Sequence, residues 1–330
     1  MNIYDIAKLS GVSIATVSRV INNSPKVSET TKKKVWDIIN AYDYTPNVFA
    51  RGLGLNSVKT VGLICPNIAD RYMANIISYL ERNLRKYGYD SILMCSGYDY
   101  DGKVEAVKNV LDRRIDAMIL VGSHYALDCG EKDVQYLKEA ANKVPVILIN
   151  GFIRAQGIYC FLTDNYKAMY DVTCSLIEKG KRKIIFLYDA NSYSTLKKLE
   201  GYQDALKDNG LDVLDSYKIF VPNNVLKVRD FLEQRDLDFD AVVASDDAMG
   251  IGAIKYAQQM HKSIPKDISI VGFNNSELCI CCEPELSSID SQEEKLSELA
   301  VDSLIKVLAG QFVRQKTEVS CQFIKRETTE

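Results

Sequence analysis

The sequence predicts a small all-α head, a short joint and a larger α/β body. Apolar residues at helical spacing, interrupted by a glycine, fill the first part of the chain. From Lys59 onward, short apolar runs alternate with amphipathic segments long enough for helices, which is the pattern of a doubly wound parallel sheet. With 330 residues, 47% of them apolar and 26% charged, the chain is long enough for two or three domains with a sizeable core.

Residues 1–46 predict three short helices that share one core. Gly11 supplies a sharp turn between the first two helices, and Ser13 can cap the second by accepting a backbone N–H. Ser28 can cap the third. The apolar positions at helical spacing are Ile3, Ile6, Ala7, Val12, Val17, Val20, Ile21, Val35, Trp36, Ile38 and Ile39. Two helices that meet at a glycine turn and pack on a third predict a helix-turn-helix.

The second helix, "IATVSRVI", presents small residues and one arginine to solvent. A helix that enters the major groove of DNA needs small residues for close approach and a few side chains that reach the bases. Ile14 and Ala15 can contact thymine methyl groups, and Arg19 can make a bidentate contact to guanine. The side chains suited to phosphate oxygens are those of Thr16, Ser18, Asn22, Thr31 and Lys32. This helix is therefore predicted to read DNA.

Charge is distributed unevenly along the chain. Residues 1–60 carry eight Lys or Arg and four Asp or Glu, a net charge of +4, whereas the whole chain carries −3. A basic head on an acidic body suits a polyanionic partner for the head alone. On charge alone, a solvated lysine-rich helix face is an equal alternative.

The sequence gives little support for a secreted protein, a membrane protein, a metal-binding protein or an enzyme. The start lacks a secretory signal and no run of about 18 apolar residues occurs, so a cytoplasmic protein without a membrane span is expected. The nine cysteines predict buried, reduced thiols. The cluster "CICC" (279–282) has no second ligand pair, so no metal site is expected. No Walker motif, nucleophile elbow or histidine-based triad appears, so neither catalysis nor a cofactor is predicted.

One motif imitates a dinucleotide site. "MGIGAIK" (249–255) follows a predicted strand and opens a predicted helix. Lys255 occupies the position of the third glycine, and Asp246 and Asp247 would repel a pyrophosphate. Nucleotide binding by this element is therefore not expected.

The run "ATVSRVIN" followed by "VSETTKKKV" resembles the DNA-binding head of the lactose-repressor (LacI/GalR) family of bacterial transcription regulators, and the resemblance continues to Glu330. It implies a DNA-binding head over 1–46, which includes Tyr4 and Ser13 among its contacts. It also implies a hinge helix or linker over 47–58, whose Asn47, Ala50 and Leu53 meet the minor groove, with the leucine as a wedge. From the local sequence alone, an ordinary linker is the alternative.

For 59–330 the resemblance implies a periplasmic-binding-protein-like effector-binding and dimerisation domain. Its two doubly wound parallel-sheet subdomains would cover about 59–158 with 290–320, and about 159–289 with 321–330. An effector would bind between them, at the carboxyl ends of strands. The matching positions are Tyr72, Met73, Ser123, His124, Asn150, Asp164, Ser192, Ser194, Lys198, Phe220, Asp246 and Asn274. For any one of these, a polar strand end satisfied by water is the alternative.

Three of these positions depart from the family pattern. Lys198 replaces an arginine, "DD" at 246–247 replaces "ND", and "GFNN" at 272–275 replaces "GFDD". A lysine lacks the guanidinium fork, and Asn274 cannot serve as an anionic acceptor. The effector is therefore expected to differ from those of better-known relatives, and the cleft could even have lost small-molecule binding.

The resemblance thus predicts a sequence-specific transcriptional regulator, most often a repressor in this family, which is switched by a sugar-like effector. It would bind double-stranded operator DNA as a homodimer, since the chain stops soon after its last apolar run, at "FIKRETTE", without a heptad-rich tail. A phosphocarrier protein is a further partner that some relatives use. The rivals are a solute-binding protein of a transporter, which would need a signal peptide, and an enzyme with a sugar or nucleotide substrate.

Overall fold

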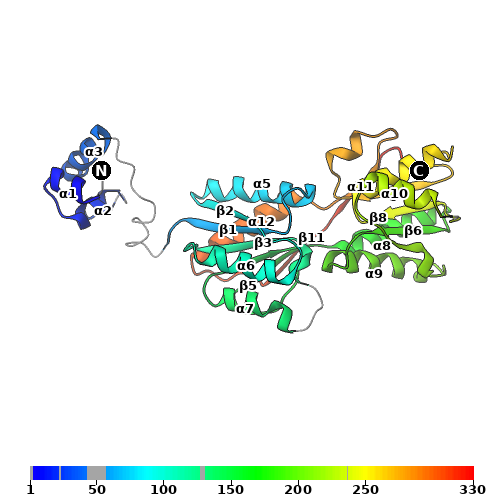
Figure 1. Cartoon of the computed structure of the whole chain (residues 1–330), viewed down its shortest axis with the longest axis horizontal. Coiled ribbons are helices and arrows are strands. Elements are labelled where there is room, and N and C mark those ends of the chain that lie inside the picture. Colours follow the sequence, from blue (N-terminus) through cyan, green and yellow to red (C-terminus); the bar gives the residue numbers. More distant parts are fainter. Residues whose placement is uncertain (1–2, 22–23, 43–56, 127–130, 236) are drawn as a thin grey trace. The chain divides into compact units, whose positions relative to one another are not determined.

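The N-terminal unit is a bundle of three helices. The computed structural model describes residues 3–21, 24–42, 57–126, 131–235 and 237–330. The three helices are α1 (Ile3–Ser10), α2 (Ile14–Ile21) and α3 (Glu29–Ala41) (Figure 1). Their common core consists of Ile6, Ala7, Val17, Val20, Ile21, Val35 and Ile39.

Trp36 differs from the expectation, because it is exposed. The buried stripe of α3 runs through Val35, Ile38 and Ile39, which stand three and four residues apart. A residue one position after Val35 points about 100° away from that stripe. Trp36 therefore lies at the edge of the bundle rather than in its core.

The turn between α1 and α2 depends on Gly11. This residue has φ +64°, in the left-handed region that favours glycine. The Gly11 N–H donates to the Lys8 carbonyl at 3.4 Å, and the Val12 N–H donates to the Ala7 carbonyl at 3.2 Å. The Ser13 hydroxyl then accepts the Thr16 N–H at 3.2 Å, which caps α2 as the sequence predicts.

Replacing Gly11 by alanine is expected to destabilise the head by about 1 kcal/mol, because a side chain disfavours this backbone conformation. A β-carbon there would meet only the Lys34 Nζ, at 3.7 Å, so conformation alone is tested. Trp36 is the only tryptophan of the chain, so its fluorescence reports unfolding of the head. Gly11→Asn is the control and should lose less stability, because asparagine tolerates this region better. Equal stability of all three proteins would contradict the assignment.

The body contains two six-stranded sheets. The first has the order β11-β5-β4-β3-β1-β2 and the second the order β12-β10-β9-β8-β6-β7. The first consists of β1 (Thr60–Cys65), β2 (Asp90–Cys95), β3 (Ala117–Val121), β4 (Val146–Ile149), β5 (Ile158–Thr163) and β11 (Lys316–Val319). The second consists of β6 (Ile184–Tyr188), β7 (Lys218–Phe220), β8 (Ala241–Ala244), β9 (Ser269–Phe273), β10 (Ser287–Asp290) and β12 (Gln322–Ile324). β12 runs antiparallel to β10, which departs from the purely parallel sheets expected.

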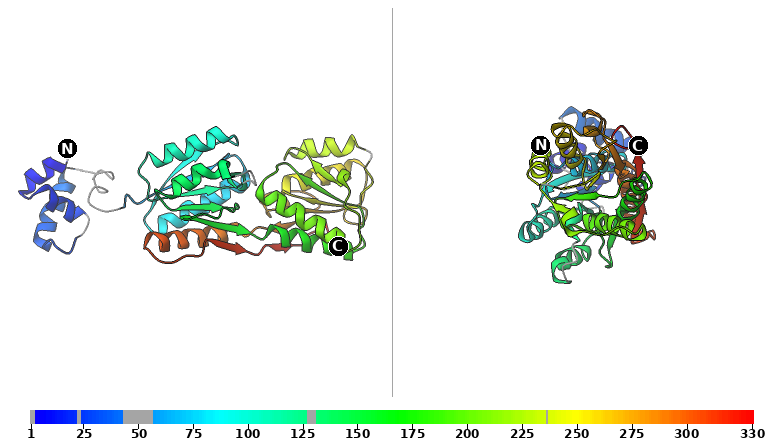
Figure 2. Two further views of the ribbon diagram at one scale, coloured as in Figure 1. Left: turned by 90° about the horizontal axis from the view of Figure 1, so that it is seen from below. Right: turned by 90° about the vertical axis from the view of Figure 1, so that its right-hand side faces the viewer.

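Helices cover both faces of each sheet (Figures 1 and 2). Those of the first half are α5 (Arg71–Lys86), α6 (Tyr100–Leu111), α7 (Gln135–Ala141) and α12 (Glu293–Leu308). Those of the second half are α8 (Asn165–Glu178), α9 (Tyr193–Asp208), α10 (Val225–Glu233) and α11 (Asp247–Gln259). α5 and α12 lie side by side and bury Leu80 and Leu304 against Leu63 and Ile119 of the sheet. In the second half, α8 pairs with α9 and α10 pairs with α11.

The chain passes between the two halves after β5, after β10 and after β11. The first passage follows Thr163 rather than residue 159, because β5 pairs with both β4 and β11 in the first sheet. The later passages follow Asp290 and Val319. The carboxyl ends of the parallel strands in each half open toward these connections, which places the polar residues that follow the strands near one another.

Candidate functional site

The face of α2 opposite its core is open to solvent. Val17, Val20 and Ile21 are buried, whereas Ile14, Ala15 and Arg19 are exposed. Tyr4 and Ser13 are exposed beside them, and Thr16 and Ser18 are half-buried. A short helix with small side chains around one arginine on its free face has the shape and chemistry that major-groove reading requires.

The start of α3 carries the two residues predicted to contact phosphate. The Thr31 hydroxyl lies 2.9 Å from the Ser28 hydroxyl, and the Thr31 N–H donates to the same oxygen at 3.3 Å. The Lys32 ammonium donates to Glu29 at 2.7 Å, so a phosphate would take the place of an exposed carboxylate. Outside the described residues lie the predicted contacts Asn22, Asn47, Ala50 and Leu53, and with them residues 47–56 of the hinge predicted over 47–58.

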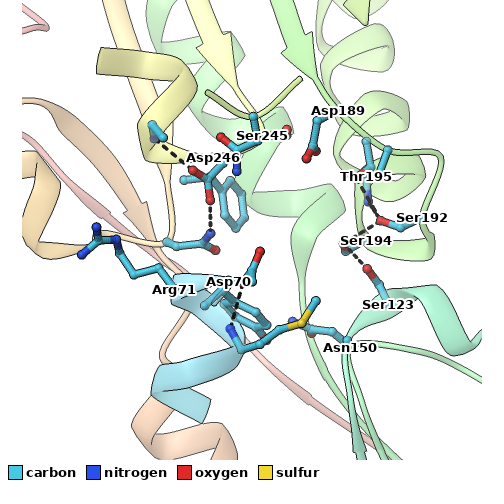
Figure 3. Close-up of a pocket in the computed structure, with 18 of the residues that line it drawn as sticks. Asp70, Arg71, Ser123, Asn150, Asp189, Ser192, Ser194, Thr195, Ser245 and Asp246 are labelled. Carbon is cyan, nitrogen blue, oxygen red and sulfur yellow. Dashed lines mark hydrogen bonds between the residues drawn. The ribbon is translucent and has the colours of Figure 1, made fainter. Parts of the chain in front are cut away.

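A cleft of about 920 Å³ lies between the two halves of the body (Figure 3). Of the predicted effector residues, those that line it are Tyr72, Met73, Ser123, His124, Asn150, Ser192, Ser194, Lys198, Phe220, Asp246 and Asn274. Asp164 does not line it. Its carboxylate instead caps α8 by accepting the Lys167 N–H at 3.0 Å, so the expectation for Asp164 was wrong in placing it in the cleft.

Asn150 organises the wall of the first half. Its Oδ1 accepts the Thr163 N–H and hydroxyl, both at 3.1 Å, and its Nδ2 donates to the Tyr72 hydroxyl. Burial holds the pKa of the Tyr72 phenol well above its usual value, so the hydroxyl stays neutral. Asp70 caps α5 by accepting the Met73 N–H at 3.0 Å.

The floor of the second half is built around Lys198. Its ammonium donates to the Ser245 carbonyl at 2.9 Å and stands 3.4 Å from the centroid of the Phe273 ring. Only 6% of the residue is exposed, and burial lowers the pKa of Lys198 to about 8. The ammonium is thus fixed under the cleft by a carbonyl and an aromatic face.

Two of the residues that depart from the family pattern, Asp246 and Asn274, are joined by a hydrogen bond. Asp246 accepts the Ala248 N–H at 2.9 Å through one oxygen, which caps α11, and the Asn274 side-chain amide at 3.0 Å through the other. The neighbouring Asp247 is buried and accepts the Ser276 N–H at 2.7 Å and the Ser288 hydroxyl at 2.5 Å. Burial raises the pKa of Asp247 to about 6. Asp246 faces the cleft, whereas Asp247 holds the loop after β9.

A direct hydrogen bond joins the two halves at the rim of the cleft. The Ser194 hydroxyl of α9 donates to the Ser123 hydroxyl at 2.9 Å. Beside it, the His124 ring packs edge-on against Tyr98 with centroids 4.9 Å apart. Burial, followed by the charge of Lys103, lowers the pKa of His124 to about 4, so its imidazole is neutral at neutral pH.

Three carboxyl groups of the cleft, those of Asp70, Asp189 and Glu293, were missed by the sequence reasoning. Burial raises the pKa of each, that of Glu293 to about 8. Asp189 directly follows the predicted strand "KIIFLY", so the rule that ligands bind beyond strand ends could have found it. Glu293 opens α12 after a passage between the halves, and no local signal marks it.

Neither a metal-ion cluster nor a membrane-spanning helix is found among the described residues. Over the described residues, no cluster of three or more His, Cys, Asp or Glu side chains is arranged to hold a metal ion. In the same part of the chain, no helix is both long and apolar enough to cross a membrane.

Comparison with known proteins places this architecture among regulators. Residues 2–47 match the family of bacterial regulatory proteins of the lacI type, and residues 174–329 match a periplasmic binding protein-like domain. An HTH-type transcriptional regulator of Lachnoclostridium phytofermentans is 46% identical over 332 residues, which cover 100% of this chain and 99% of that protein. Catabolite control protein A of Priestia megaterium is 31% identical, with 93% and 92% covered.

Solved structures agree on the fold. The lac repressor dimer bound to operator and the anti-inducer ONPF superposes with a TM-score of 0.89 at 22% identity, covering 100% of this chain and 99% of that one. The regulator CelR in complex with cellobiose gives a TM-score of 0.71 at 23% identity, with 99% of each chain covered. With a helix-turn-helix head, a two-part α/β body and a relative that is 46% identical along its whole length, this chain belongs to the lacI family of bacterial regulatory proteins and is a DNA-binding transcriptional regulator.

Proposed function

We propose that the protein is a homodimeric repressor whose affinity for operator DNA is switched by a sugar-like effector bound in the cleft. The observation that carries this proposal is the presence in one chain of a free α2 face and a large polar cleft. The lac repressor is bound to operator as a dimer, and CelR is bound to cellobiose, in the structures that share this fold. Their likeness to this chain supports a dimer and a sugar effector.

We propose one role for each of three consecutive parts of the chain. Residues 1–46 bind DNA, residues 47–58 connect, and residues 59–330 bind the effector and pair the protomers. Two heads would read two half-sites of a near-palindromic operator. Since effector and operator bind one two-state molecule, each would change the affinity for the other by the same factor.

The proposed mechanism uses the connections between the halves. An occupant of the cleft touches both walls and so favours one angle between them, at the rim where Ser194 now donates to Ser123. That angle would decide whether the two connecting segments can dock on DNA together. The proposed role is regulatory rather than catalytic, and its place of work is the cytoplasm, where the chromosome lies. A phosphocarrier protein is kept as a second regulator, supported by the similarity to catabolite control protein A.

The test is a selection of DNA fragments from a randomised library with the full-length protein, followed by titration against sugars. A near-palindromic consensus, bound as a dimer and released or tightened by one sugar, is the expected result. A protein that selects no consensus, or whose DNA affinity no small molecule changes, would contradict the proposal.

Replacing Lys32 by alanine is expected to weaken binding to all DNA sequences about equally and to reduce the salt dependence by about one counterion, because the ammonium would contact phosphate. Filter binding over a range of salt concentrations measures both quantities. Lys108→Ala is the matched control, since it removes the same charge from an exposed position of α6. If Lys108→Ala had the same effect, Lys32 would have no contact of its own.

A further inference from the structure

The cleft contains more acidic than basic groups. Asp70 caps α5, Asp189 follows β6 and Asp246 caps α11, so their carboxylates come from three separate parts of the fold. Figure 3 shows all three directed toward the same space. These like charges repel one another: burial raises the pKa of both Asp70 and Asp189, and the charge of Asp246 adds to the rise.

The basic groups of the described lining offset only part of this charge: burial raises the pKa of the Asp189 carboxyl, and the charge of Lys198 counters only part of that rise. The Lys198 ammonium is committed to the Ser245 carbonyl and to the Phe273 ring. Arg71 belongs to the lining, but Figure 3 shows its guanidinium directed away from the three carboxylates. The remaining titratable base, His124, is neutral because burial lowers its pKa to about 4.

Asp189 gives a second, independent indication. It is half-buried, and the donor to its carboxylate is its own backbone N–H rather than a side chain. By contrast, Asp70 and Asp246 each cap a helix. A half-buried carboxylate that is hydrogen-bonded only within its own residue keeps acceptor lone pairs that a ligand can use.

The walls above these carboxylates are aromatic. Phe220 lines the cleft with 55% of its surface exposed, and its ring stands edge-on to Tyr188 with centroids 5.4 Å apart. Tyr98 lines the cleft on the side of the first half. Aromatic faces attract both the C–H faces of sugars and the positive charge of an ammonium.

We infer that the effector carries a protonated primary amine, which binds between Asp189, Asp70 and Asp246, on a hydroxylated ring, and that the site rejects anionic sugars. An amino sugar has this chemistry. Its ammonium donates three hydrogen bonds to carboxylates that repel one another in its absence, and its hydroxyls meet the amides of the walls. This inference rests on the proposed function and narrows the class of effector.

Sugars matched in all but charge test the inference. Full-length protein is titrated by calorimetry with glucosamine, galactosamine and mannosamine, with the N-acetyl derivative and the neutral parent of each, and with glucose 6-phosphate. At least one free amine should bind about tenfold or more tightly than both of its matched neutral sugars, since charge-assisted hydrogen bonds are about twice as strong as neutral ones. The phosphate should not bind.

Asp189→Asn keeps the shape of the side chain and removes its charge. It should reduce about tenfold the ratio of the affinity for the amine to the affinity for its neutral parent sugar. Asp70→Asn is the second variant, because asparagine also caps helices and so preserves the start of α5. Asp171→Asn is the matched control, since it removes one negative charge from the exposed side of α8, outside the cleft, and should change neither affinity.

The outcomes separate this inference from the proposed function. Neutral sugars that bind as tightly as the amines, or a phosphate that binds best, would overturn the inference and leave a sugar-switched repressor in place. Failure of every amine in the panel to bind would also overturn the inference, whether or not the protein selects an operator. Failure to select an operator, measured separately, would overturn the proposed function.

Discussion

Replacing Arg19 by alanine is expected to lower operator affinity by roughly 1–3 kcal/mol and to relax the base preference at one position in each half-site. Arg19 is exposed on α2 and is the one basic side chain of that helix, so no neighbour on it can take over a bidentate contact to guanine. Its core neighbours Val17 and Val20 are untouched, so the head should remain folded.

Titration against a library of single-base operator variants measures this effect. The informative comparison is with Lys32→Ala, which should weaken all of these operators equally. If Arg19→Ala and Lys32→Ala gave the same uniform loss, Arg19 would contact phosphate rather than a base.

Replacing Glu293 by glutamine is expected to stabilise the body at alkaline pH by roughly 2–4 kcal/mol. Burial raises the pKa of Glu293 from 4.5 to about 8 in the folded protein. Between those pH values the folded protein keeps a proton that the unfolded chain has released. The stability that Glu293 contributes to the wild-type protein is therefore highest below pH 4.5 and falls as the pH rises above that value. The loss is complete once the pH has passed the folded-state pKa of about 8. Glutamine keeps the shape and carries no charge, so the variant should not show this loss.

Denaturant unfolding of the body, followed by circular dichroism from pH 4.5 to 9, measures the difference. Glu298→Gln is the matched control, because it removes a carboxylate from an exposed position of the same helix. Curves for wild type and Glu293→Gln that run parallel across the whole range would show that Glu293 is ionised in the folded protein.

The head could be predicted from sequence almost completely, because its determinants are local. The turn at Gly11 and the caps at Ser13 and Ser28 are set by residues a few positions apart. In the body, seven strands were predicted from their apolar runs. β5 was missed although its run "IYCFLT" is largely apolar. Four shorter strands, β7, β10, β11 and β12, were also missed. These strands are three or four residues long and mix polar with apolar side chains, as in "KTEV". Distant neighbours in the sheet decide such segments, and a single sequence does not reveal those neighbours.

Cleft residues that directly follow a strand could be predicted from the sequence. The interaction between two positions that are far apart in the sequence could not. Taken separately, Asp246 and Asn274 count as two losses of the family pattern. In the structure the two side chains are hydrogen-bonded to each other. The carboxylate stands at 246 and the amide at 274, the reverse of the family pattern, so the pair still contains one carboxylate and one amide. Asp164 failed in the opposite way, because a residue at a strand end can as well begin the next helix.

The three passages between the halves have a consequence for how the protein is made. The sheet of the first half needs β11, from residues 316–319, to cover the outer side of β5, and α12 to bury α5. The sheet of the second half needs β12 for its edge. Until the ribosome has added α12, β11 and β12 (residues 293–324), neither half can be complete, although β1 to β5 left the ribosome long before. Both halves therefore finish folding in the same late step, and a nascent body exposes its unpaired β5 edge and the apolar side of α5 until then.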